Sequence, residues 1–157
     1  MKQAAAATFA FVEPMKALPV QELPVGDWLY ELKFDGYRAL AFKAGKDVRL
    51  ISRNRTNFDN DYPQLIDALK SLTAKQATID GEIAALDDQG RASFQRLQSY
   101  GKAKKSPLVY YAFDLLSLDG TDLRARPLTE RRKLLARLLK NASENIRFSE
   151  ELQGTRD

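Results

Sequence analysis

The stretch ELKFDGYR, residues 31–38, carries the most information about the fold of this chain. If it is extended, Glu31, Lys33 and Asp35 point to one face, and the apolar residues between them point to the other. Gly36 then permits a tight turn or a close approach of the backbone to a ligand. The pattern predicts either a strand that presents three charges to a ligand or a solvated strand edge that ends in a turn.

Short strands are expected both in this stretch and along the chain that follows it. The residue patterns predict strands at 28–34, 38–42 and 48–52, the last two joined by a Gly-containing hairpin link at 44–47. Further strands are expected at 77–86, 108–116 and 146–149, with a turn at 87–90.

Three helices are expected between these strands. Apolar residues at helical spacing predict one that starts near Tyr62-Pro63, while Ser93 and Thr129 are expected to cap the other two. The third should carry leucines at positions 134, 135, 138 and 139. Short links with helices between strands imply an α+β fold with largely antiparallel sheets flanked by helices. The sequence has no glycine-rich strand-to-helix phosphate loop, which argues against Rossmann and P-loop folds.

The organisation is that of one domain with a short tail. Residues 1–10 are expected to form a flexible tail, and residues 11–157 a single unit that opens with a proline-rich extended segment at 11–26. No apolar run is long enough to span a bilayer. We expect a monomer. The absence of cysteine fits a cytoplasmic protein.

Composition narrows the chemistry. The 157 residues include no cysteine and no histidine, which excludes disulfides, thiolate zinc sites, cysteine nucleophiles and imidazole bases. A bound metal would therefore be a hard cation held by carboxylates and phosphates, which favours Mg²⁺ or Mn²⁺. The net charge of +4 suits a polyanionic partner, although many domains that bind no nucleic acid carry a similar charge.

A set of motifs resembles one enzyme family. Lys33-x-Asp35-Gly36-x-Arg38 matches the K-x-D-G-x-R signature of the covalent nucleotidyltransferases, which are DNA ligases, RNA ligases and capping enzymes. Three segments resemble later motifs of the family, in the family's order: residues 52–54 (SRN), 79–83 (IDGEI) and 111–116 (YAFDLL). Residues 11–15 (FVEPM) and 28–31 (WLYE) are similar to the lead-in of bacterial end-joining ligases. The resemblance therefore covers nearly the whole chain, and it implies the nucleotidyltransferase (ATP-grasp-like) fold of ATP-dependent DNA ligases.

The resemblance implies that Lys33 attacks the α-phosphate of ATP to give lysyl-AMP. The AMP is then passed to a DNA 5′-phosphate, and a nick in double-stranded DNA is sealed during end-joining repair. The amine must be neutral to attack, and only about a thousandth of ordinary lysines are neutral near pH 7.4. Arg38 and a bound metal would favour the neutral form, whereas Glu31 and Asp35 would favour the charged form.

Further roles follow from the same resemblance. It implies that Arg38 and Arg53 bind the nucleotide and the nick phosphate. The alternative for Arg53 is a solvated strand end. Glu82 would contact the ribose or a metal, with Asp35 as a second tentative metal ligand, or Glu82 would form only a surface salt bridge.

The resemblance also assigns the base and a DNA contact. Phe113 would stack on adenine or else pack in the core. Glu31 would lie near the base and help to select it. Lys102, Lys104 and Lys105 form a basic loop that either contacts the DNA backbone or is simply solvated.

The chain departs from the family pattern near its C-terminus. It contains neither the E-G-x-V-x-K motif, nor the lysine motif that follows it, nor the OB-fold domain. We therefore expect the N-terminal part of an adenylation domain, with little or no self-adenylation of its own. Two alternatives stay open. One is a non-catalytic nucleic-acid-binding module, and the other is an RNA ligase or capping-type nucleotidyltransferase.

Overall fold

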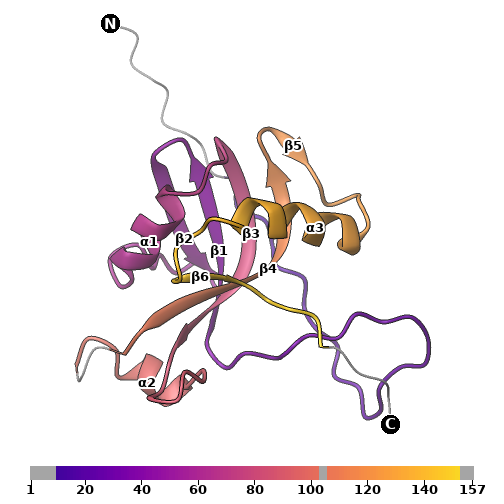
Figure 1. Ribbon diagram of the computed structural model, residues 1–157, viewed down its shortest axis with the longest axis horizontal. Coiled ribbons are helices and arrows are strands. Elements are labelled where there is room, and N and C mark those ends of the chain that lie inside the picture. Colours follow the sequence, from indigo (N-terminus) through magenta and orange to yellow (C-terminus); the bar gives the residue numbers. More distant parts are fainter. Residues whose placement is uncertain (1–9, 103–105, 153–157) are drawn as a thin grey trace, which may run out of the picture.

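A single six-stranded sheet forms the centre of the computed structural model, which describes residues 10–102 and 106–152 (Figure 1). The strands follow the order β2-β1-β3-β4-β5, and β6 pairs with β4. All pairings are antiparallel except that of β4 with β6, which is parallel. The strands are β1 (Tyr37–Ala44), β2 (Asp47–Ser52), β3 (Gln76–Ala85), β4 (Leu108–Leu118), β5 (Thr121–Asp122) and β6 (Ile146–Phe148). The expected α+β class is confirmed, with one mixed sheet in the described part of the chain.

Three helices contribute to the hydrophobic core on one face of this sheet. They are α1 (Pro63–Lys70), α2 (Phe94–Gln98) and α3 (Leu128–Leu139). Successive residues of a strand point to opposite faces, so alternate residues of β1 and β3 meet these helices. The buried cluster includes Ala39, Ala41, Ile79 and Ile83 from the sheet and Leu65, Leu69, Leu97 and Leu135 from the helices.

The opposite face carries the other half of each strand. Arg38 and Phe42 of β1 lie on it beside their cross-strand partners Glu82 and Thr78 of β3. The N-terminal segment crosses this face, since the Met15 carbonyl accepts a hydrogen bond from Arg38. We call it the open face. Arg38 and Glu82 lie on the open face. The family resemblance assigns them contacts with a phosphate and a metal.

Several local expectations are confirmed. The 44–47 link joins β1 and β2 as a hairpin, with Gly45 at a φ of 61°. Pro63 occupies the first turn of α1, where its missing N–H costs no hydrogen bond. The Ser93 side chain caps α2 by accepting a hydrogen bond from the backbone N–H of Arg96 at 3.4 Å. These signals depend only on neighbouring residues, so the sequence alone was enough to reveal them.

Two local expectations are wrong. Residues 28–34 do not form a strand, because their only pairing among the described residues is an isolated bridge between Glu31 and Glu151. The chain ahead of the Glu31 bridge forms an open loop away from the sheet (Figure 1). Thr129 does not cap α3. The helix begins at Leu128, and its N-cap is Pro127, which makes no side-chain cap hydrogen bond. The fixed φ of proline already suits the entrance to a helix. The tail expected at residues 1–10 lies almost wholly outside the described residues.

Within the described residues, no helix has the length and apolar character required to cross a membrane.

Candidate functional site

Lys33 lies in the connection between the Glu31 bridge and β1. Its side chain is exposed and makes no hydrogen bond or ion pair with any other described residue. Gly36 fixes the end of this connection, because its backbone N–H donates to Glu82 Oε1 at 3.1 Å. A Cβ on Gly36 would lie 2.0 Å from the carbonyl oxygen of Ile83. The segment that carries Lys33 therefore docks on β3 through a position that only glycine can occupy.

Glu82 is the carboxylate on which this segment docks. Burial raises its pKa, and the Gly36 N–H and the charges of Arg38 and Lys33 oppose that rise. The nearby Asp35 carboxylate raises it further. Arg38 is the cross-strand partner of Glu82, and Lys33 and Asp35 lie in the segment that Gly36 docks on Glu82, so these four residues lie in one region. Glu82 forms no ion pair with a described residue.

Arg38 is tied to Asp80 on the open face. Its Nε donates to Asp80 Oδ1 at 3.1 Å and its Nη2 to Asp80 Oδ2 at 2.8 Å. Its Nη1 donates to the Met15 carbonyl at 2.6 Å. The bonded carboxylate raises the pKa of Arg38, while burial outweighs the arginine and raises the pKa of Asp80. These bonds use three of the five N–H donors of the guanidinium, so two remain for a phosphate.

Aromatic residues of β4 complete this region. Phe113 is partly buried, lies outside the hydrophobic core cluster, and has its ring centroid 5.4 Å from the Arg38 guanidinium carbon. Phe113 thus lies beside Arg38 on the open face. Tyr111 stacks on Phe34 with ring centroids 3.8 Å apart and planes 8° apart. This stack anchors the residue that follows Lys33 onto the sheet.

Arg53 lies in a tight turn next to Arg38. Its backbone N–H donates to the Arg38 carbonyl at 3.3 Å. Ser52 Oγ organises the turn by accepting hydrogen bonds from the N–H groups of Asn54 and Thr56 at 3.2 and 3.0 Å. The Arg53 side chain is exposed and pairs with no described residue. The structure thus brings the second expected arginine to the same end of β1 with its charge available.

The expected basic loop is described only in part. Lys102 is exposed at the end of the α2 region, whereas Lys104 and Lys105 lie outside the described residues. Nothing in the described contacts links Lys102 to the region around Lys33. The loop therefore remains a prediction.

Metal binding would rest on few protein ligands. In the described ranges, no three acidic side chains converge in a way that could hold an ion. Asp35 and Glu82 lie close enough to influence each other, but Asp80 is occupied by Arg38. Mg²⁺ commonly binds through one or two carboxylates plus phosphate oxygens and water. The two carboxylates fit that arrangement only together with a phosphate ligand.

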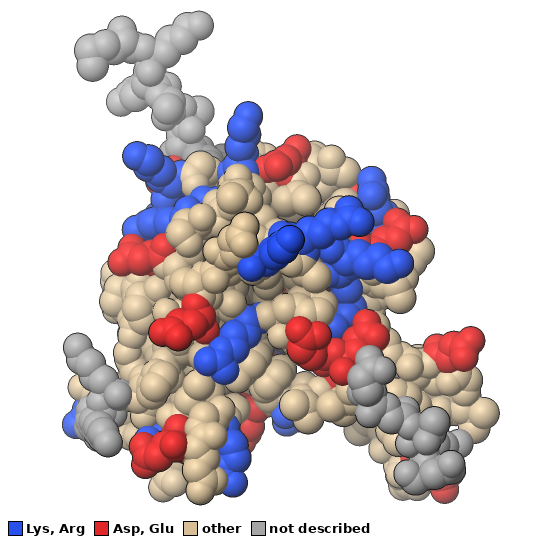
Figure 2. Space-filling view, in the orientation of Figure 1, with Lys and Arg blue, Asp and Glu red and all other residues tan. Residues whose placement is uncertain are grey.

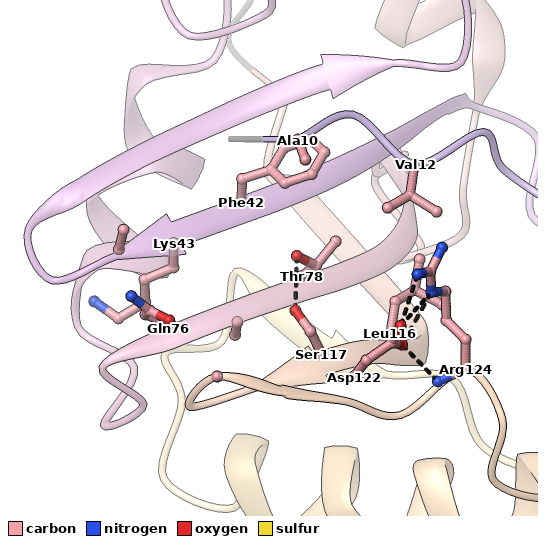
Figure 3. Close-up of a pocket in the computed structure, with 13 residues that line it drawn as sticks. Ala10, Val12, Phe42, Lys43, Gln76, Thr78, Leu116, Ser117, Asp122 and Arg124 are labelled. Atoms are coloured by element: carbon pink, nitrogen blue, oxygen red, sulfur yellow. Dashed lines mark hydrogen bonds and ion pairs between the residues drawn. The ribbon is translucent and has the colours of Figure 1, made fainter. Parts of the chain in front are cut away.

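A cavity of about 380 Å³ lies at the other end of β1 and β3 (Figure 3). None of the expected site residues lines it, and two of its polar side chains, Thr78 and Ser117, bond each other at 2.9 Å. Its charged pair, Asp122 and Arg124, is likewise joined internally. It is lined by Ala10, Val12, Phe42, Lys43, Ala44, Gln76, Ala77, Thr78, Leu116, Ser117, Gly120, Asp122 and Arg124. Its lysine, Lys43, is buried and donates to the carbonyls of Gly45 and Lys70, so we place the candidate site around Lys33 instead.

Two features of the site were missed in the sequence. Gly81 leaves room for Tyr110, because a Cβ there would lie 2.5 Å from the Tyr110 ring. The Tyr110 hydroxyl lies 2.9 Å from the carbonyl oxygens of Ala39 and Ile79 beneath the open face. Arg132 is the second feature: it is buried on α3 and bonded to Glu31. An arginine three residues before the core Leu135 was the available signal.

A family model matches almost the whole chain. The model described as "ATP dependent DNA ligase domain" covers residues 11–156. The chain is 38% identical over 144 residues to the multifunctional non-homologous end joining protein LigD of Pseudomonas aeruginosa, covering 90% of this chain and 17% of that protein. It is 34% identical to DNA ligase C1 of Mycolicibacterium smegmatis, covering 83% of this chain and 41% of that protein.

Solved structures agree with this match. The crystal structure of the ligase domain from M. tuberculosis LigD aligns with a TM-score of 0.69 and 35% identity, over 81% of this chain and 41% of that one. A mycobacterial DNA ligase D complexed with ATP and MES aligns with a TM-score of 0.67 and 33% identity, over 80% of this chain and 40% of that one. The chain thus spans less than half the length of each of these relatives.

Proposed function

Because the chain belongs to the ATP-dependent DNA ligase domain family, we propose that its open face binds ATP and that Lys33 accepts AMP from it. The docking of Gly36 on Glu82 is the observation that carries the proposal. It gathers a free lysine, an arginine and two carboxylates in front of a strand whose aromatic side chains are not part of the core. A base, a triphosphate and a metal need that combination of groups.

The proposed first step forms one bond and breaks one. The neutral Lys33 amine attacks the α-phosphorus, an N–P bond forms, and the bond to the leaving pyrophosphate breaks. The amine proton is lost to solvent, and the exposure of Lys33 leaves that route open. Arg53, with no partner in the described chain, is available to a phosphate oxygen. AMP then passes to a DNA 5′-phosphate, and the nick is sealed.

A magnesium or manganese ion bound by Glu82 and Asp35 would neutralise phosphate charge in this step. The chain's own residues supply the rest. Gly36 and the Phe34–Tyr111 stack hold the lysine segment against the sheet. Asp80 holds Arg38 at the edge of the same region.

The proposed macromolecular partner is nicked double-stranded DNA. Later adenylation motifs and an OB-fold domain, which this sequence does not contain, would bind it together with this chain. We expect the protein in the cytoplasm of a bacterial cell, because DNA repair needs both the DNA and ATP there. Figure 2 shows lysine and arginine side chains gathered over α3. Lys133, Arg137 and Lys140 are exposed at helical spacing and form no ion pair with described residues. This basic stripe suits phosphate contacts, as the Lys102 loop does.

Two alternatives make different predictions. An RNA ligase or capping-type enzyme would accept another substrate or prefer GTP, so labelled ATP and GTP distinguish it. The second alternative is a non-catalytic nucleic-acid-binding module. Such a module would bind DNA without responding to ATP.

Amide chemical shifts during a titration with Mg-ATP test the proposal. We expect weak binding, because the chain lacks the late lysines that would pair with the triphosphate. The shifts should cluster at Glu31, Lys33, Arg38, Glu82 and Phe113. Shifts confined to the cavity of Figure 3, or to the Lys102 loop, would contradict the proposed site.

A further inference from the structure

Arg132 is a charged side chain enclosed by the core. Its side chain is 2% exposed, and it lies on the same face of α3 as the buried Leu135 and Leu139. Burial of a charge costs several kcal/mol unless the charge is paired and hydrogen-bonded. An arginine at such a position therefore needs partners, and they show what it does.

Its partners come from three separate segments. Nη1 donates to a carboxylate oxygen of Glu31 and to the Phe113 carbonyl, the latter at 3.1 Å. Nη2 donates to the Ser149 carbonyl at 2.6 Å, and the guanidinium lies 4.6 Å from the Phe148 ring centroid. One side chain thus joins the segment before Lys33, the aromatic strand β4 and the C-terminal strand.

The arginine also stabilises an unfavourable pair. Glu31 and Glu151 face each other in an isolated antiparallel bridge, and like charges directly opposite each other are destabilising. Arg132 bonds the first glutamate, and its Nε lies 3.8 Å from Oε1 of the second. That Nε is buried and has no hydrogen-bond partner. The charge of Arg132 therefore holds together two segments whose glutamates would otherwise repel.

The geometry points to Arg132 as a positioning residue that sets base specificity through Glu31. This inference rests on the proposed nucleotide site. Arg132 occupies one oxygen of Glu31, whose side chain remains 26% exposed. The remaining lone pairs of an ionised carboxylate accept hydrogen bonds only. They favour the 6-amino group of adenine and disfavour a 6-oxo group at the same place.

The same nitrogen fixes the carbonyl of Phe113, whose ring lies on the open face. Glu31 and the proposed stacking residue therefore share one donor. Movement of Arg132 would shift both base contacts together, while Lys33, Arg38 and Glu82 keep their own contacts. Substitution of Arg132 should therefore weaken the selectivity for the base while the nucleotide still binds.

The test compares ATP with inosine triphosphate, which carries a 6-oxo group in place of the 6-amino group. Dissociation constants for both are measured by the same titration on the whole chain and on Arg132→Met, Arg132→Lys and Glu31→Gln. The wild type should prefer ATP by about tenfold, the contribution of one charge-assisted hydrogen bond. Arg132→Met and Glu31→Gln should bring the two constants within about twofold. Arg132→Lys, which keeps the charge but loses the fork, should give an intermediate ratio.

Arg91→Met is the control, because it removes a 71% exposed arginine that is paired with Asp87 and contacts no candidate site residue, and it should leave the ratio unchanged. If Arg132→Met does not fold, Glu31→Gln and Arg132→Lys decide, since both leave Arg132 or its replacement with a partner. An unchanged ratio in the folded variants, with ATP still bound, would overturn this inference alone. A wild-type chain that binds neither nucleotide would overturn the proposed function and this inference with it.

Discussion

Arg38 and Asp80 are joined by two hydrogen bonds of 3.1 and 2.8 Å across β1 and β3. The Asp80 side chain is 5% exposed and the Arg38 side chain 25% exposed. The arginine of the K-x-D-G-x-R motif is thus paired with the aspartate of the later D-G-E motif. The two motifs hold the open face together before any ligand is bound.

Arg38→Ala should lower the free energy of unfolding by about 2–3 kcal/mol, because it leaves a buried carboxylate without its partner. The partial exposure of Arg38 keeps the loss below that of a fully buried pair. The matched control is Arg49→Ala, whose bond to Asp59 involves a 54% exposed arginine and should contribute less than about 1 kcal/mol. Urea denaturation checks both values. Equal losses in the two variants would contradict the account of the pair.

The same variant has a pH signature. Burial already raises the pKa of Asp80, and Arg38 opposes that rise. Without Arg38 the pKa should rise further, so the folded state binds a proton over a wider range than the unfolded state. The free energy of unfolding should then fall as pH rises from the ordinary aspartate pKa through the raised value. Arg38→Ala should consequently lose less stability relative to wild type at pH 4 than at pH 7.

Gly36→Ala should displace the lysine segment. Its Cβ would meet the Ile83 carbonyl at 2.0 Å, so the contact between Gly36 and Glu82 should break. We expect a loss of more than about 2 kcal/mol and of the Mg-ATP shifts at Lys33. Gly90→Ala is the control, because its surroundings are open and only its φ of 76° opposes a side chain, at a cost of about 1–2 kcal/mol. Unchanged nucleotide binding in Gly36→Ala would contradict the role of this contact.

Glu82→Gln should be as stable as wild type at pH 7, or more stable by up to about 1 kcal/mol, which is about 2–4 °C in Tm. The amide oxygen can still accept from Gly36, and the cost of burying the charge is gone. Since burial raises the pKa of Glu82, the contribution of Glu82 to the stability of wild type should fall as pH rises through that value, and the variant should lack this fall. Nucleotide binding should nevertheless weaken. Thermal unfolding at several pH values, with and without Mg-ATP, checks both. A variant that is less stable at pH 7 than at pH 4 relative to wild type would contradict it.

DNA binding should be weak and sensitive to salt. The variant in which glutamine replaces Lys133, Arg137 and Lys140 should lose about three phosphate contacts. The slope of log affinity against log salt concentration should therefore become shallower by about three. The comparison variant replaces the loop lysines at 102, 104 and 105. Fluorescence anisotropy with nicked duplex DNA measures both slopes. Tight, nick-selective binding at physiological salt would contradict the expected need for further domains.

Local signals in the sequence predicted most of the elements correctly. The hairpin at 44–47, Pro63 in α1 and the Ser93 cap depend on residues a few positions apart. The strand expected at 28–34 was wrong because a strand needs a partner, and Glu151 alone pairs there in the described part of the chain. The parallel pairing of β6 with β4 was likewise invisible, since it joins residues distant in the chain.

The candidate site divides in the same way. The motif fixed the types and order of Lys33, Asp35, Gly36 and Arg38, but not what each touches. The exclusion of a side chain at Gly36 by Ile83, and the Met15 contact of Arg38, arise from packing between distant segments. Arg132 was missed because an arginine among leucines on a helix ordinarily suggests a solvated face.

The role of Lys33 is the central claim, and intact-mass spectrometry tests it most directly. Residues 11–152 would be joined to the part of the M. tuberculosis LigD ligase domain that follows the matched region, then incubated with Mg-ATP. The fusion protein should gain one AMP, which peptide mapping places on Lys33. Lys33→Ala should gain none, and Lys46→Ala should gain it normally. The short chain should react about a hundredfold more slowly or less, because cations at the developing phosphate charge are missing. An AMP adduct that persists in the Lys33→Ala fusion protein would contradict the account.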